Sequence, residues 1–314
     1  MFVFLAMTVV PARLCAEPLA EETEISITCQ LMQAPSIGQV PVFAMTKECE
    51  ECKGTYHYKL WLPKGYNAAP QRRWPCMFMA SAGGNAKMGQ MAGWLKANRY
   101  IVVMLVESKN GPWAPIIGNF LAAHDDVVNR VRIQEGLKFA TGMSGGARAS
   151  SMFVQLRAGF CGLILQGAGA AYDPQNRYAA TGLRQNAALY IAMTVGRKDN
   201  NFGEANRMKN LIPSNRFFAV EFDGGHVWAP ADVFGKAITW TEQCVYDTGT
   251  TNPVLRPIYL TRFGVLADKC VAATTPEKRS KAAEAALAYA RLRNLAGDPA
   301  VAAQLAALRT GKAP

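Results

Sequence analysis

Short runs of apolar residues recur through the middle of the chain, and each has the length of a β-strand. The first run alternates between apolar and polar positions, whereas most of the later runs are nearly continuous. Continuous runs of this length are typical of strands that are covered on both faces, as in a parallel sheet. The pattern therefore predicts strands at residues 56–62, 75–80, 100–106, 137–141, 162–166, 189–195 and 216–222.

Segments with apolar residues at helical spacing lie between these runs. A strand followed by a helix, repeated several times, predicts a doubly wound α/β domain with a mostly parallel central sheet and helices on both faces. The expected helices are residues 90–97, 121–132, 147–158 and 204–211, with a closing helix at 231–243.

The pattern changes after residue 247. Residues 248–253 read Thr-Gly-Thr-Thr-Asn-Pro, which is typical of a turn-forming linker. Two Ala-rich segments follow at 276–295 and 299–308, and their composition fits two helices. We therefore expect a core domain over residues 17–247 and a linker with a helical extension over 248–314. The extension either packs back on the core or forms a dimer contact, and the sequence leaves the oligomeric state open.

Composition and charge add two points. Half of the 314 residues are hydrophobic and 18% are charged, which is ordinary for a globular enzyme. The net charge is +11, and residues 253–314 hold ten Lys and Arg against four Asp and Glu. A solvated basic helical face is the commoner meaning of such a tail, so no nucleic-acid partner is expected.

The N-terminus has the pattern of an export signal. Residues 1–10 are apolar except for Thr8, and Leu14-Cys15-Ala16 offers small residues for cleavage. We therefore interpret residues 1–16 as a signal peptide and expect the protein to be secreted or periplasmic. No segment reaches the roughly 20 apolar residues that a membrane-spanning helix needs, so no stable span is expected.

Seven cysteines remain after residue 16, an odd number. Cys76 and Cys161 lie in or beside predicted strands and are expected in the core. The single Cys-x-x-Cys lacks the second ligand pair of a zinc site, and no metal site is predicted. In an oxidising compartment, disulfides are expected among some of Cys29, Cys49, Cys52, Cys244 and Cys270.

The sharpest local motif is Gly142-Met-Ser144-Gly-Gly146, which connects a predicted strand to a predicted helix. A Gly-x-Ser-x-Gly turn in this setting is the nucleophile-elbow pattern. Side chains at Gly142 and Gly146 would collide with neighbouring backbone, and Ser144 is expected to stand above the sheet in a strained conformation. Ser144 is the candidate nucleophile.

Histidine provides an independent test, because the chain has only three. On a scaffold with this elbow, the acid and then the base follow the nucleophile in the sequence. Only His226 follows Ser144, and it lies directly after the predicted strand at 216–222. We therefore predict His226 as the base and structural roles for His57 and His124.

The acid must lie between the nucleophile and the base, at the end of a strand. Asp199 follows the predicted strand at 189–195 and is the candidate. It would orient His226 and stabilise its protonated ring. Asp173 and Asp223 are alternatives, and both have the sequence context of turn residues.

Acyl transfer also needs N–H donors for the developing oxyanion. Gly145 follows the nucleophile and supplies the first donor, and either Ala82 or Gly83 supplies the second from the Gly-rich loop after an early strand. Trp113 and Trp228 lie in loops expected at this edge of the sheet and are candidate substrate-pocket residues. Arg148 is assigned no catalytic role.

Several of these segments together resemble the α/β-hydrolase superfamily, and the similarity extends over about residues 55–245. The nearest branch comprises secreted esterases related to polyhydroxyalkanoate depolymerases and to feruloyl or acetyl-xylan esterases. One departure concerns the oxyanion loop, because relatives commonly have His-Gly where this chain has Ala80-Ser81. The resemblance rests on Leu60-Trp-Leu-Pro-Lys-Gly-Tyr66, Ala82-Gly-Gly-Asn85, Ser144-Gly-Gly-Ala-Arg148, the turn at Asp199 and Gly224-Gly-His226-Val-Trp228.

The resemblance and the motifs together predict a serine hydrolase that cleaves carboxylic esters through an acyl-enzyme. The implied substrate is an ester, of plant-polymer or polyester origin, and no cofactor motif is present. Two alternatives stay open: a serine peptidase on the same scaffold, and a decayed hydrolase that acts as a binding protein.

Overall fold

The computed structural model describes residues 18–247, 256–293, 295, 297–299 and 301–309. The expected signal peptide at 1–16 and the expected linker at 248–253 lie outside these residues. No helix in the described ranges is both long and apolar enough to span a membrane.

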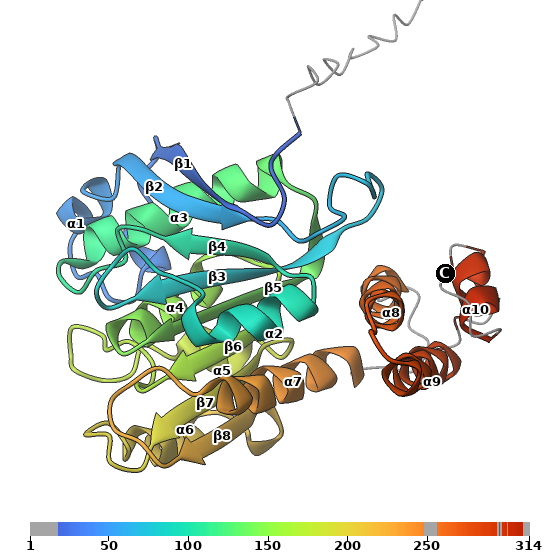
Figure 1. Ribbon diagram of the computed structural model, residues 1–314. Coiled ribbons are helices and arrows are strands. Elements are labelled where there is room, and N and C mark those ends of the chain that lie inside the picture. The colour runs from blue at the N-terminus through green and yellow to red at the C-terminus, as the bar shows by residue number, and fades with distance from the viewer. Residues whose placement is uncertain (1–17, 248–255, 294, 296, 300, 310–314) are drawn as a thin grey trace, which may run out of the picture.

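An eight-stranded sheet forms the centre of the described chain, in the order β1-β2-β4-β3-β5-β6-β7-β8 (Figure 1). Strands β3 to β8 run parallel to one another, whereas β2 runs antiparallel to both β1 and β4. This is the sheet of an α/β-hydrolase fold, and the fold class expected from the sequence is confirmed. The strands are β1 (Glu24–Leu31), β2 (Gly54–Trp61), β3 (Trp74–Ser81), β4 (Ile101–Leu105), β5 (Ile133–Met143), β6 (Phe160–Gln166), β7 (Tyr190–Gly196) and β8 (Phe217–Phe222).

Helices cover both faces of this sheet (Figure 1). Residues of α3, α4 and α6 share a buried cluster with one face, and residues of α2 and α7 share a second cluster with the other. The helices are α1 (Thr46–Glu50), α2 (Ala92–Ala97), α3 (Trp113–Arg130), α4 (Gly145–Leu156), α5 (Thr181–Gln185), α6 (Glu204–Leu211), α7 (Ala231–Asp247), α8 (Arg256–Val271), α9 (Pro276–Leu292) and α10 (Ala302–Arg309).

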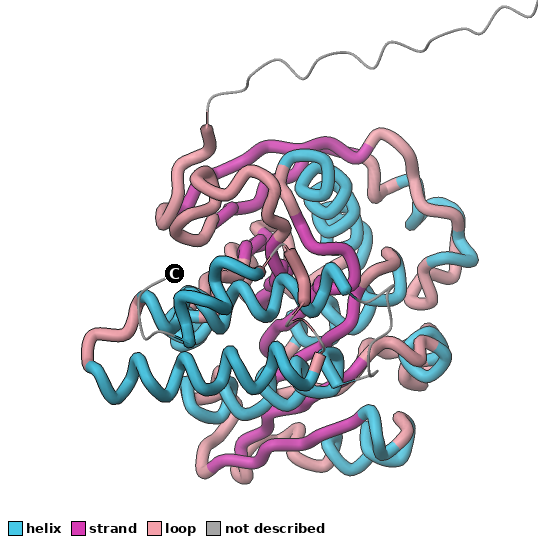
Figure 2. Tube along the Cα trace, turned by 90° about the vertical axis from the view of Figure 1, so that its right-hand side faces the viewer, coloured by secondary structure: helices cyan, strands magenta, loops and turns pink. Residues whose placement is uncertain are grey.

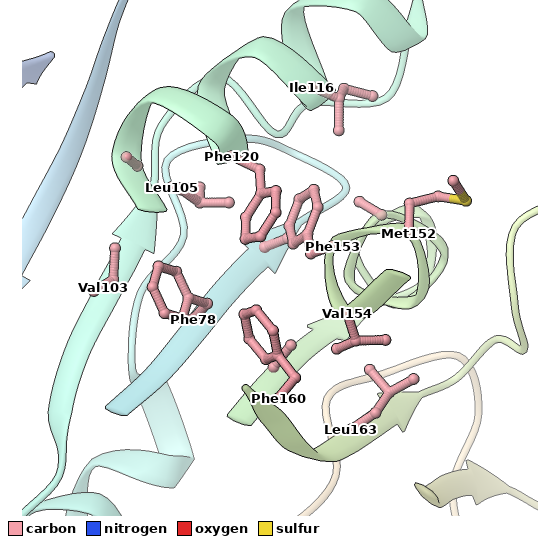
Figure 3. Packing of buried hydrophobic residues seen from close by; sticks show 14 of the residues in the cluster. Phe78, Val103, Leu105, Ile116, Phe120, Met152, Phe153, Val154, Phe160 and Leu163 are labelled. Carbon is pink, nitrogen blue, oxygen red and sulfur yellow. The ribbon is translucent and has the colours of Figure 1, made fainter. Parts of the chain in front are cut away.

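The core on the α3 and α4 face is rich in aromatic rings (Figure 3). Phe120 of α3 stacks on Phe153 of α4 with ring centroids 4.1 Å apart, and Phe78 of β3 meets Phe120 edge-on at 5.9 Å. Strand β3 serves both faces, because Phe78 belongs to this cluster while Met77 and Met79 belong to the opposite one. A continuous apolar strand is therefore required here, as its sequence indicated.

Strand β1 was not predicted from the sequence. Its side chains alternate, with Ile27, Cys29 and Leu31 buried and the residues between them exposed. This is the pattern of an antiparallel edge strand with one solvated face, and this alternation is the signal by which the sequence could have revealed it.

Helix α8 is a second difference, because two helices were expected after residue 253 and the described chain has three. Tyr259 and Phe263 are buried on one side of α8, and Thr261 and Val265 are buried on another. A helix that is covered on more than one side lacks the single apolar stripe by which surface helices are recognised.

The C-terminal helices pack against the sheet domain. Buried residues of α8, α9 and α10 belong to the same apolar cluster as those of α2 and α7. Polar contacts reinforce this packing, because Arg72 pairs with Asp268 at 2.8 Å and Lys269 donates to Asn98 Oδ1 at 2.7 Å. Figure 1 shows the three helices beside the end of α7, and Figure 2 views them from their own side.

The expected disulfides are absent, and none of the seven described cysteines forms one. Cys29 lies on β1, Cys52 follows α1, and Cys270 lies on α8. The thiol of each donates a hydrogen bond to a backbone carbonyl at 3.5 Å. Burial raises the pKa of Cys29 and of Cys52 to about 12. Because the thiolate is the form that reacts, these residues are poorly suited to oxidation. As expected, Cys76 and Cys161 are buried in β3 and β6.

Replacing Phe263 by Ala tests whether α8 belongs to the core. Phe263 is completely buried, so the variant should lose about 3 to 5 kcal/mol of unfolding free energy in a denaturant titration. Val271, at the end of the same helix, is 49% exposed, and Val271→Ala should change stability by less than about 0.5 kcal/mol. Equal effects of the two substitutions would contradict the packing of α8 described above.

Candidate functional site

Ser144 stands alone between the end of β5 and the start of α4. Its φ is 56°, a left-handed value that is strained for any residue except glycine. The turn is tight: a methyl group on Gly142 would lie 2.2 Å from the carbonyl oxygen of Gly146, and one on Gly146 would lie 2.5 Å from that of Ala80. Both glycines are therefore required by backbone contacts, as the sequence predicted.

Ser144, His226 and Asp199 form a connected chain of side chains. The Nε2 atom of His226 lies 2.8 Å from Ser144 Oγ, and its Nδ1 atom lies 2.9 Å from each carboxylate oxygen of Asp199. The Asp199 side chain is fully buried, whereas that of His226 is 40% exposed. Asp199 also accepts a hydrogen bond from the Asn201 N–H at 2.8 Å. A buried carboxylate thus holds one side of the ring, and the other side faces the serine and solvent.

The segments that carry the acid and the histidine are attached to each other. The N–H of Lys198 donates to the Gly224 carbonyl at 2.9 Å, and a methyl group on Gly196 would lie 2.3 Å from that same oxygen. Gln166 adds a further link, because its side chain accepts from the Ala229 N–H at 3.2 Å. The histidine loop is therefore fixed at both of its ends.

The backbone of Gln166 also touches the nucleophile. Its carbonyl oxygen accepts from the Ser144 N–H at 2.9 Å, and its fully buried side chain donates to Thr141 Oγ1 at 3.0 Å. Gln166 thus connects the elbow to the histidine loop. The only sign of this role in the sequence is a glutamine at the end of an apolar strand.

The alternative acids are occupied elsewhere. Asp173 accepts hydrogen bonds from Arg177 within its own turn, and Asp223 is an exposed residue that pairs with Lys198 at 3.1 Å. Neither contacts His226. Asp199 is the only one of the three considered that the structure places against the His226 ring.

The other two histidines also contact neighbours outside this site. His57 Nδ1 lies 2.7 Å from Glu107, and the buried His124 lies between Asp125 and Lys138. Burial lowers the pKa of His124. Within the described ranges, no three His, Cys, Asp or Glu side chains are grouped as metal ligands.

The candidate oxyanion donors lie on two segments that meet beside Ser144. Gly145 is the first residue of α4, where backbone N–H groups have no partner within the helix. On the opposite loop, the Gly83 N–H donates to Ser81 Oγ at 3.3 Å, which favours Ala82 over Gly83 as the second donor. Ser81 is anchored in turn by two hydrogen bonds with Ser108, at 3.0 and 3.2 Å. These bonds hold the loop at the position where the sequence has Ala80-Ser81.

Asn110 connects the two segments and was not singled out in the sequence. Its N–H donates to the Ala82 carbonyl at 2.8 Å, and its side-chain oxygen would lie 1.6 Å from a methyl group on Gly145. Glycine at position 145 thus admits the Asn110 amide next to the nucleophile.

The two candidate pocket tryptophans are placed differently. Trp228 lines a cavity of about 360 Å³ together with Ser81 and Gly84 of the oxyanion loop. Trp113 is the first residue of α3 and packs against the aromatic core cluster, and it is not among the residues that line this cavity.

Arg148, to which no catalytic role was assigned, forms a local salt bridge. It pairs with the buried Glu204 of α6 at 2.7 Å, and Glu204 also accepts from the Gly169 N–H at 2.7 Å. Burial alone raises the pKa of Glu204, but hydrogen bonds from Arg148 and Gly169 outweigh burial, and the pKa lies below its usual value. This ion pair joins the elbow helix to the helix that follows the acid turn.

Comparison with known proteins gave only distant structural similarity. No protein-family model matches the sequence, and no curated protein matches it. S-formylglutathione hydrolase FrmB from Staphylococcus aureus is 12% identical, with a TM-score of 0.49 over 71% of this chain and 98% of that chain. A ferulic acid esterase is 14% identical, with a TM-score of 0.48 over 70% and 98% of the two chains. Porphyromonas gingivalis dipeptidyl peptidase 4 is 14% identical, with a TM-score of 0.42 over 61% of this chain and 33% of that chain.

Substitution of Gly142 tests the tight contact at the elbow. Gly142→Ala should lower the unfolding free energy by about 1 to 3 kcal/mol or more, because the new methyl group meets backbone that has no room to move. Gly225→Ala is the matched control, since open space surrounds that position. Thermal melts of the two variants beside the wild type measure the difference, and a normal melting temperature for Gly142→Ala would contradict the geometry.

The ion pair of Glu204 predicts a dependence on pH. Because its pKa is lower in the folded chain, its stabilising effect is complete above the unfolded pKa of about 4.3 and declines as the pH falls through the folded pKa. Glu204→Gln should lose about 3 to 5 kcal/mol at pH 7 and show a flatter pH profile than the wild type.

Urea titrations between pH 3 and pH 7 measure this profile. Glu221→Gln, which breaks the exposed pair with Arg197, is the control and should change stability by at most about 1 kcal/mol. A Glu204→Gln profile parallel to that of the wild type would show that Glu204 does not contribute to acid sensitivity.

Proposed function

We propose that this protein hydrolyses carboxylic esters through an acyl-enzyme intermediate. The observation that carries the proposal is the continuous contact from Ser144 Oγ through the His226 ring to the buried Asp199 carboxylate. A serine beside an imidazole that a carboxylate orients is the arrangement that activates a hydroxyl as a nucleophile. The proposal rests on this geometry and not on the distant structural neighbours.

In the first half of the proposed reaction, Ser144 Oγ attacks the ester carbonyl carbon and its proton passes to His226 Nε2. The carbonyl oxygen becomes an oxyanion, which the N–H groups of Gly145 and Ala82 stabilise. When the intermediate collapses, the ester C–O bond breaks and the departing alcohol takes the proton from His226. An acyl group remains on Ser144.

The second half uses the same groups with water. His226 Nε2 removes a proton from a water molecule as the water oxygen attacks the acyl carbon. The bond to Ser144 Oγ then breaks, the proton returns to Ser144, and the free acid leaves. Throughout both halves Asp199 stabilises the positively charged ring and keeps its Nε2 atom facing the serine.

The finer substrate class is also a proposal. The sequence motifs resemble those of esterases that act on plant-polymer esters and polyesters, and Trp228 supplies an aromatic surface in the adjoining cavity. We also propose that residues 1–16 are a signal peptide that directs export of the protein. Export would bring the enzyme to a substrate outside the cytoplasm.

A fluorophosphonate probe and a 4-nitrophenyl butyrate assay test the mechanism. The wild type should react with the probe, and Ser144→Ala and His226→Ala should not. Ser144→Ala should lower ester turnover by at least about 10⁴-fold, and Asp199→Asn should have an effect of similar size. Peptide anilides assayed in parallel distinguish an esterase from a peptidase.

His57→Gln is the matched control, because His57 contacts Glu107 and not Ser144. It should keep both labelling and turnover. A folded wild type that neither binds the probe nor cleaves the ester would favour a binding protein on a decayed hydrolase scaffold.

A further inference from the structure

The cavity of about 360 Å³ adjoins the site at which the ester would be attacked. Trp228, two residues after His226, lines it together with Ser81 and Gly84 of the oxyanion loop. The loop that leads from there into α2 provides the remaining walls. The cavity is therefore bounded by the loop that follows His226 and by the loop that carries the candidate oxyanion donors.

The charge of the cavity is unbalanced. Lys87 is its only ionisable lining residue, and none of the residues that line it is acidic. Lys87 makes no ion pair with any residue in the described part of the chain. The acids that flank these segments in sequence are engaged elsewhere, because Glu107 contacts His57 and Asp232 pairs with Lys236.

A second lysine, Lys109, lies on a neighbouring segment. Lys109 lies on the loop after β4. Its Cβ would lie 3.2 Å from a methyl group on Gly84, a glycine that lines the cavity. Lys109 likewise makes no ion pair within the described ranges. Lys109 is not among the residues that line the cavity, so the charge at the cavity wall is that of Lys87.

The other walls fit the body of an organic acid. Met91 and Trp228 offer apolar and aromatic surface, and Asn85 and Gln90 offer amide groups. An apolar lining with few polar groups and one charge is typical of a site that fixes the orientation of a small ligand. The lysine selects the sign of the ligand's charge, because a carboxylate gains from it and an ammonium group does not.

We propose that this cavity binds a carboxylate of the substrate at Lys87, so that the preferred esters carry a negative charge near the scissile bond. This inference rests on the proposed esterase function and specifies its substrate class. The apolar part of the acid lies between Met91 and Trp228, and the carboxylate extends to the ammonium group. Esters of dicarboxylic acids and of hydroxy acids have this chemistry.

Paired substrates of nearly equal shape test the proposal. Mono-4-nitrophenyl glutarate and its methyl ester differ by a charge on the acyl part, and 4-carboxyphenyl and 4-carbamoylphenyl butyrate differ by a charge on the alcohol part. In at least one pair, the wild type should favour the charged ester about fivefold in kcat/KM. Lys87→Met should abolish the preference, and Lys87→Glu should reverse it.

Lys278→Met is the matched control, because it removes the same charge from the exposed start of α9. It should keep the wild-type preference, and 0.5 M NaCl should weaken that preference in both proteins. A wild type without any preference for charge, or a preference that survives in Lys87→Met, would overturn the proposal.

A binding experiment separates this inference from the proposed reaction. Calorimetric titration of Ser144→Ala with glutarate and with 4-hydroxybenzoate measures carboxylate binding without turnover. In the Ser144→Ala protein, the further substitution Lys87→Met should weaken the binding of at least one of these acids about fivefold. That result supports the anion site even if no ester is cleaved. Ester cleavage together with carboxylate binding that does not depend on Lys87 would keep the hydrolase and reject the anion site.

Discussion

At Gly142 and Gly146 the backbones of β3, β5 and α4 approach so closely that a single methyl group would be forced to within 2.5 Å or less of a carbonyl oxygen. The close approach leaves Ser144 with a left-handed backbone and places its hydroxyl group above the sheet. A longer turn would leave the hydroxyl group mobile, and Ser144 would lose its fixed position relative to His226. The rest of the site is arranged around this one constraint.

His226 and Asp199 are fixed by a different means, because they come from loops. Loops are ordinarily the mobile parts of a fold. Here the acid turn and the histidine loop bond to each other at Lys198 and Gly224, and Gln166 bonds both to the histidine loop and to the Ser144 N–H. The buried Gln166 side chain accepts a hydrogen bond from Ala229 and donates one to Thr141. These bonds satisfy its polar groups, which explains how a polar residue can lie deep in the sheet.

The electrostatics of the site combine a buried anion with an exposed cation. Asp199 is fully enclosed, so its charge acts strongly on His226. Lys87 faces a cavity that solvent reaches, so its attraction for a substrate is weaker and depends on salt. The first arrangement suits a permanent catalytic contact, and the second suits a ligand that must bind and leave.

The sequence by itself indicated the parallel strands, the tight turn at Ser144 and the set Ser144, Asp199 and His226 that the structure brings together. Each depends on local pattern: continuous apolar runs, glycines at a tight turn, and a single histidine after the serine. The alternation in β1 was present in the sequence but was not used. The helix α8 and the state of the cysteines could not be determined from the sequence, because they depend on what covers each segment. The sequence also did not show the roles of Gln166, Asn110 and Lys87. Those roles arise only when segments far apart in the chain are brought to one edge of the sheet, and no spacing along the chain records such contacts.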